Sequence, residues 1–173
     1  MDLIWTNMFD VRLPVPVPPP SYRLVIQIVS TRTNRELHAA LECYKQYHGG
    51  KSFMDVVIRP KAYKNFAGLM EKVLECKRDE SGMGYDDETA AILAAQLDHA
   101  TTKKDAATFI KIFGHMSRSQ FTSLNAVYTK HGGVIESLGK FSGDFHSLLL
   151  ARCTDRLHFL CFRLSTDKEA IPR

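Results

Sequence analysis

The sequence predicts an all-α fold made of two related helical units. From Tyr22 onward, apolar residues recur at intervals of three and four, the spacing that places them on one face of an α-helix. No segment alternates apolar and polar residues between hairpin-forming turns, as a half-buried strand would. Ile26 aligns with Ile110 and Tyr44 with Tyr128 at one offset of 84 residues. A duplication of this kind is typical of stacked helical repeats.

The composition is that of an ordinary folded chain with a mild basic bias. Of 173 residues, 45% are hydrophobic, and the net charge of +4 favours anionic partners without separating lipid from nucleic acid. The four cysteines form no C-x-x-C pair, so a zinc site is not expected. No apolar run reaches about 18 residues and no signal-peptide pattern opens the chain. We therefore expect a cytoplasmic protein without a membrane-spanning helix.

Residues 1–21 differ in composition from the rest of the chain. Five of them are proline, at positions 14, 16, 18, 19 and 20. Proline fixes φ and lacks an amide donor, which disfavours helix. This segment is therefore expected to be a proline-rich, extended leader.

The first unit, residues 22–76, is expected to contain about four helices. The first two follow from apolar stripes at Leu24, Ile28 and Val29, then at Leu37, Ala40, Leu41 and Tyr44. Thr33 or Asn34 can cap the second helix, and Gly49-Gly50 ends it. A short helix near 53–58, ended by Pro60, and a longer one over 63–76 complete the unit.

The second unit follows a polar connector at residues 77–87. It spans 88–155 and begins with a helix over 88–100, which the first unit lacks. The His-Gly-Gly set at 131–133 then matches that at 48–50. A short helix at 134–138 and a longer one at 144–153 follow, as in the first unit. The second unit is therefore expected to hold five helices.

Several motifs, in order, resemble the annexin repeat. Ile28-Val-Ser-Thr-Arg-Thr-Asn34 is similar to the family's L-x-T-R-[ST] turn, and Lys140-Phe-Ser-Gly-Asp-Phe145 is similar to the entry into the last helix of a repeat. Residues 164–173 resemble the opening of a further repeat. The order is similar to the middle of a plant-type annexin: a truncated repeat two at 22–76, a complete repeat three at 88–155 and the start of another at 156–173. The resemblance implies a fragment of a longer annexin.

The resemblance also implies calcium-dependent binding to phospholipid membranes, at the inner membrane face. Annexins hold Ca²⁺ with carbonyl oxygens of a glycine-rich loop and a distant carboxylate, as a hard cation requires. Here Thr101 and Lys103 stand in the two glycine positions, and Lys140 and Lys61 stand where the carboxylates belong. The weak remaining ligand candidates are Thr101, Lys103, Asp105, Thr166 and Asp167. Asp105 and Asp167 are more simply explained as helix N-caps. The sequence thus predicts degenerate calcium sites.

Three other functions remain open. Lys61, Lys103, Lys104 and Lys140 could bind anionic membranes without calcium, because lysines near an anionic leaflet are attracted to it. Residues 105–130 could form a helix-turn-helix, with Ser117–Gln120 opening a recognition helix for nucleic acid, although the scattered basic residues argue against it. A helical scaffold held by protein contacts alone is the third.

The sequence shows no motif of an active site. No nucleophile turn or phosphate-binding loop is present, so we expect no enzyme.

Overall fold

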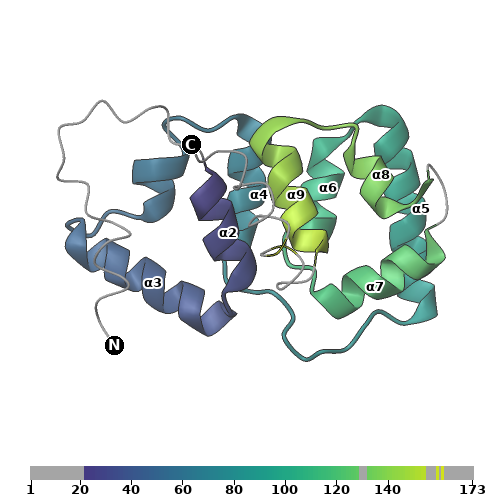
Figure 1. Cartoon of the computed structure of the whole chain (residues 1–173), viewed down its shortest axis with the longest axis horizontal. Helices are drawn as coiled ribbons and strands as arrows, with labels where there is room; N and C mark the ends of the chain where they lie inside the picture. The colour runs from purple at the N-terminus through teal and green to yellow at the C-terminus, as the bar shows by residue number, and fades with distance from the viewer. Residues whose placement is uncertain (1–21, 129–131, 155–158, 160, 162–173) are drawn as a thin grey trace, which may run out of the picture.

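The computed structural model describes residues 22–128, 132–154, 159 and 161, and these residues contain helices and no strand (Figure 1). The all-α prediction is therefore confirmed. The first half contains α2 (Arg23–Thr31), α3 (Asn34–Tyr47), the π-helical turn η1 (Met54–Ile58) and α4 (Lys64–Leu74). The second half contains α5 (Asp87–Lys103), α6 (Ala106–Phe113), α7 (Arg118–Val127), α8 (Val134–Leu138) and α9 (Gly143–Cys153).

The two halves share one order of elements. Thr33 caps α3 in a capping box with Glu36, and Ser117 caps α7 in a capping box with Gln120. In each box the hydroxyl accepts the third amide of the helix while the longer side chain bonds back to the cap, so two otherwise unpaired donors are satisfied. The two boxes stand at the same 84-residue offset that the sequence shows. Accordingly α2 corresponds to α6, α3 to α7, η1 to α8 and α4 to α9, while α5 has no described counterpart.

The halves meet through a crossed pair of helix contacts. Helix α2 packs against α9, and α4 packs against α6. These two contacts are equivalent, because α6 is the counterpart of α2 and α9 is the counterpart of α4. Helices α4 and α9 also contact each other. In Figure 1 these four helices form the middle of the molecule, with α3 and α7 at its lower edge. The fully buried side chains of this central layer include Phe66, Leu69, Met70, Phe109, Phe113, Leu148 and Leu149. Burying each such side chain stabilises the fold by about 1.5–3 kcal/mol.

The connector between α4 and α5 is bonded to both halves. On the first half, the Asn34 side chain donates to the Arg78 carbonyl (2.7 Å), and the Arg78 guanidinium donates to the Arg32 carbonyl (2.7 Å). On the second half, the Gln120 amide donates to the Asp79 carboxylate (2.8 Å), and the Asp79 backbone N–H donates to the His115 carbonyl (3.3 Å). The connector therefore spans the α2–α3 and α6–α7 turns.

The predicted helix at 88–100 is longer in the structure, because α5 continues through Lys103. Thr101 is 1% exposed, and its hydroxyl donates to the Leu97 carbonyl (2.7 Å), which keeps the last turn helical. The predicted short helix near 53–58 is a π-helical turn. No helix in the described part of the chain is long and apolar enough to cross a membrane. The predicted leader at 1–21 lies outside the described residues.

Replacing Gly114 with alanine is expected to lower the free energy of unfolding by about 1–3 kcal/mol. The added Cβ would lie 2.6 Å from the Lys72 Cβ of α4 and 2.8 Å from the Ile110 carbonyl oxygen. Neither atom can move without its helix. Gly68→Ala is the control, since its Cβ would meet only the terminal methyl of Ile110, at 3.2 Å. Denaturant unfolding compares the two variants, and equal stability would contradict close packing of α4 on α6.

Candidate functional site

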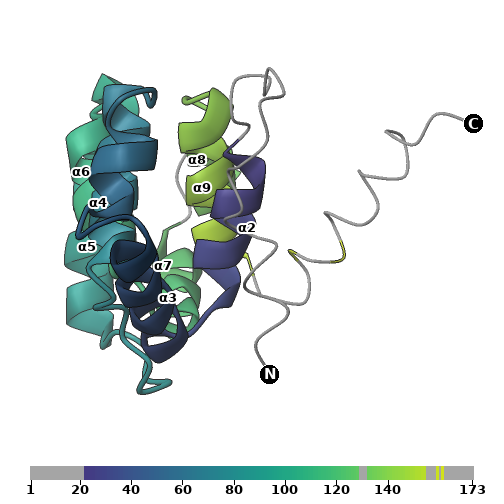
Figure 2. The same cartoon turned by 90° about the vertical axis from the view of Figure 1, so that its left-hand side faces the viewer.

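Three interhelical loops lie along one edge of the molecule. The η1–α4, α5–α6 and α8–α9 loops stand at the top of both views, while α3, α7 and the connector stand at the bottom (Figures 1 and 2). Lys61 belongs to the first loop, Lys104 to the second and Lys140 to the third, and Lys103 is the last residue of α5. All four side chains are exposed. We call this surface the lysine edge.

The α5–α6 junction is short and internally bonded. Lys104 ends α5 in the left-handed conformation (φ 54°), which glycine adopts at lower cost. Asp105 follows as the N-cap of α6, and accepts from the Ala107 backbone N–H (3.0 Å) and the Thr108 hydroxyl (2.7 Å). These bonds hold the pKa of Asp105 below its ordinary value, and the bond from Thr108 has the largest effect. The N-cap interpretation of Asp105 is thereby confirmed.

The side chains of the junction are poor ligands for a calcium ion. Such an ion takes six to eight oxygen ligands. The Thr101 hydroxyl is buried inside α5, the Asp105 carboxylate is engaged by its own helix, and the exposed cations of Lys103, Lys104 and Lys140 lie on the same edge. Among the described residues, no group of three or more His, Cys, Asp or Glu could hold a metal. Thr166 and Asp167 lie outside the described residues.

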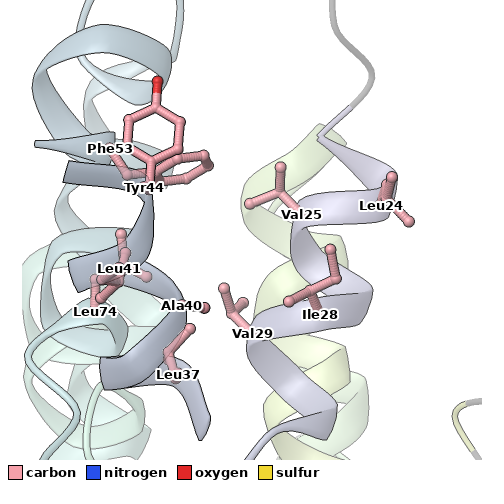
Figure 3. Close-up of a pocket in the computed structure, with 10 residues that line it drawn as sticks. All are labelled: Leu24, Val25, Ile28, Val29, Leu37, Ala40, Leu41, Tyr44, Phe53 and Leu74. Carbon is pink, nitrogen blue, oxygen red and sulfur yellow. The ribbon is translucent and has the colours of Figure 1, made fainter. Parts of the chain in front are cut away.

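An apolar groove opens on the first half, between the two apolar helix stripes that the sequence shows. Figure 3 shows α2 facing α3 across it, with Val25 and Val29 opposite Ala40 and Tyr44. The complete lining is Leu24, Val25, Ile28, Val29, Leu37, Ala40, Leu41, Tyr44, Phe53 and Leu74. In the second half, α5 packs on the corresponding helices α6 and α7. The groove is therefore the place that a counterpart of α5 would occupy.

Helix α7, the candidate recognition helix, faces inward. Phe121 and Leu124 are buried, and the Arg118 guanidinium donates to the Cys153 carbonyl at the end of α9. Arg118 is the single basic residue of α7. The arrangement therefore offers a nucleic acid little more than one arginine from this helix.

Comparison with solved structures decides the fold. Annexin III superposes with a TM-score of 0.75 and 25% identity, over 83% of this chain and 47% of that one. A chicken annexin V structure gives a TM-score of 0.73 with 21% identity, over 92% of this chain and 51% of that one. The chain has the annexin fold.

Other annexin structures agree with this assignment of the fold. Chicken annexin V in complex with Zn²⁺ gives a TM-score of 0.64 with 27% identity, over 76% of this chain and 43% of that one. The chain thus spans about half the length of the annexins it matches. No protein-family model matches the sequence. No curated protein matches it significantly.

Replacing Asp105 with alanine is expected to lower the melting temperature at neutral pH, because the first turn of α6 loses its acceptor. The folded pKa of Asp105 is depressed, so its stabilising contribution is present above the unfolded pKa and is lost as pH falls through the folded value. The difference in melting temperature between the alanine variant and wild type should therefore become smaller at acidic pH. Thermal melts followed by circular dichroism from neutral to acidic pH measure it.

Asp105→Asn is the matched control for this variant. Asparagine keeps an acceptor for the Ala107 amide but carries no charge. It should melt between the alanine variant and wild type at neutral pH, because it lacks the charge and the second oxygen that accepts from the Thr108 hydroxyl. A difference in melting temperature between the alanine variant and wild type that is the same at every pH would show that the charge of the carboxylate does not contribute to the cap.

Proposed function

We propose that this protein binds the surface of membranes rich in anionic phospholipid, with its lysine edge toward the lipid. The observation that carries the proposal is that Lys61, Lys104 and Lys140 belong to the three loops of one edge, with Lys103 at the adjoining end of α5, and that all four are exposed. Each lysine close to an anionic leaflet contributes about 1 kcal/mol. Four together supply useful affinity without a metal ion. The annexin fold supports the proposal, because phospholipid binding is the general property that this resemblance implies.

Calcium-dependent binding of the annexin type is the second candidate. Calcium-bound and apo annexin (Sm)1 both share the fold, with TM-scores of 0.70 and 0.68. The residues at the α5–α6 junction do not suit the ion, so ligands would have to come from elsewhere, Thr166 and Asp167 included. The two candidates differ in one observable, the effect of a calcium chelator on membrane binding.

The remaining features of the proposal follow from the resemblance. The first half is assigned to repeat two and the second half to repeat three of a plant-type annexin. The protein would act without enzymatic activity, in the cytoplasm and at the inner face of a membrane. The shared order of elements and the connector between the halves support the repeat assignment.

Removing two lysines from the edge is expected to weaken binding to phosphatidylserine vesicles. Lys103→Gln with Lys104→Gln should lower the partition coefficient roughly 30-fold, the equivalent of about 2 kcal/mol. Lys61→Gln with Lys140→Gln, on the other two loops, should do the same. Co-sedimentation with vesicles at low salt, with and without a calcium chelator, measures the effect.

The control pair is Arg35→Gln with Lys77→Gln, which removes the same charge from the first turn of α3 and from the connector, at the opposite edge. It should bind as wild type does. If all three pairs of substitutions weakened vesicle binding equally, the effect would come from net charge and not from the lysine edge. Binding that the chelator abolishes would favour the calcium-dependent candidate instead.

A further inference from the structure

A polar cavity of ≈ 270 Å³ lies between the two halves, at the connector side. Its walls come from the end of α2, the connector, the turn before α7 and the end of α9. A single water molecule needs a cavity of only about 10–15 Å³ when volume is measured in the same way. The cavity can therefore admit a solute of several atoms. It lies away from the lysine edge, on the side where the connector runs (Figure 1).

Three arginines from three separate elements line the cavity: Arg78, Arg118 and Arg152. Arg152 is 7% exposed and donates to the carbonyls of Phe113 (3.4 Å), Gly114 (3.4 Å) and Met116 (2.7 Å). These bonds use its Nε and Nη2, and its Nη1 has no partner among the described residues. Burial, and then the positive charge of Arg78, lower the pKa of Arg152 to about 10. Positive charge is therefore concentrated here at an energetic cost.

The two carboxylates of the cavity are engaged by other groups. Glu80 accepts from the Arg78 guanidinium (2.9 Å) and from the Asn34 backbone N–H (2.8 Å). Asp79 accepts from the Ser81 backbone N–H (2.9 Å) and the Gln120 side chain (2.8 Å). Within the described residues, neither Arg118 nor Arg152 forms an ion pair with a carboxylate. Two guanidinium charges thus remain uncompensated beside an open space.

Further donors line the same space. The Ser30 hydroxyl is buried and has no hydrogen-bond partner in the described part of the chain. An unpaired buried hydroxyl costs about 1–3 kcal/mol. The first turn of α7, at Arg118 and Ser119, adds backbone N–H groups and the positive end of a helix dipole. Each of these groups would be satisfied by an acceptor with several oxygens and negative charge.

We propose that this cavity binds a phosphate group, carried by a small soluble molecule or by a lipid head group. Guanidinium groups match phosphate oxygens in pairs, and their bonds to a charged acceptor are stronger than neutral ones. The phosphate would bridge Arg118 and Arg152 and accept from Ser30. It would also offset the repulsion between Arg152 and Arg78. The site is separate from the lysine edge, so it does not depend on the proposed membrane contact.

Calorimetric titration with inorganic pyrophosphate in a chloride buffer tests the proposal. Wild type should bind one equivalent saturably, and Arg118→Gln should bind about tenfold more weakly or worse. Arg118 is exposed, so this variant should fold, whereas Arg152 is too buried for the purpose. Lys111→Gln, an exposed control with the same charge change on α6, should bind as wild type does.

A second experiment, with vesicles, distinguishes the two sources of phosphate. The binding of wild type and of Arg118→Gln is measured on phosphatidylcholine vesicles that contain a small fraction of phosphatidylinositol bisphosphate. Weakening by Arg118→Gln in this arm supports a head group, and weakening with pyrophosphate supports a soluble ligand. Wild type that binds neither probe overturns the proposal. A loss of pyrophosphate binding in Lys103→Gln/Lys104→Gln but not in Arg118→Gln also overturns it, because the anion would then sit on the lysine edge.

Discussion

The crossed contact between the two halves is the constraint on which the rest of the structure depends. Neither half can cover its own central helices, since α2 is covered by α9 and α4 by α6. Aromatic and branched side chains such as Phe66, Phe113 and Leu148 are fully buried only in this arrangement. Glycine at position 114 lets α4 and α6 approach closely. The apolar contact fixes the relative orientation of the halves, and with it the position of every loop.

That orientation divides the polar chemistry of the molecule between two opposite edges. Corresponding loops of the two halves meet at one edge, where Lys61 and Lys140 come from equivalent positions before α4 and α9. The turns before α3 and α7 meet at the other edge, where the connector joins them and Arg78, Arg118 and Arg152 gather. The internal duplication therefore brings corresponding loops of the two halves together at each edge, while the arginines themselves and the lysines at the end of α5 have no counterpart in the other half.

The sequence predicted the architecture better than it predicted local detail. Helical spacing, the two His-Gly-Gly sets and the aligned tyrosines were sufficient for the all-α class and the duplication. They could not place the end of α5, because the burial of Thr101 depends on packing with distant residues such as Tyr128, whose hydroxyl lies 3.5 Å away. The cap at Asp105 was predictable, since capping depends on residues only two or three positions apart. The arginine cavity was not, because its three side chains lie far apart in the sequence and each alone resembles an ordinary surface charge.

The absence of a described counterpart to α5 has a consequence for motion. Helix α7 packs against α5 and α9, whereas α3 faces the groove of Figure 3, although each of these two helices buries two of its side chains. Local opening requires least free energy where few apolar contacts must break. Although α3 and α7 occupy corresponding positions and each begins with a capping box, they should therefore differ in dynamics: α3 should exchange its amide hydrogens with solvent sooner than α7 does.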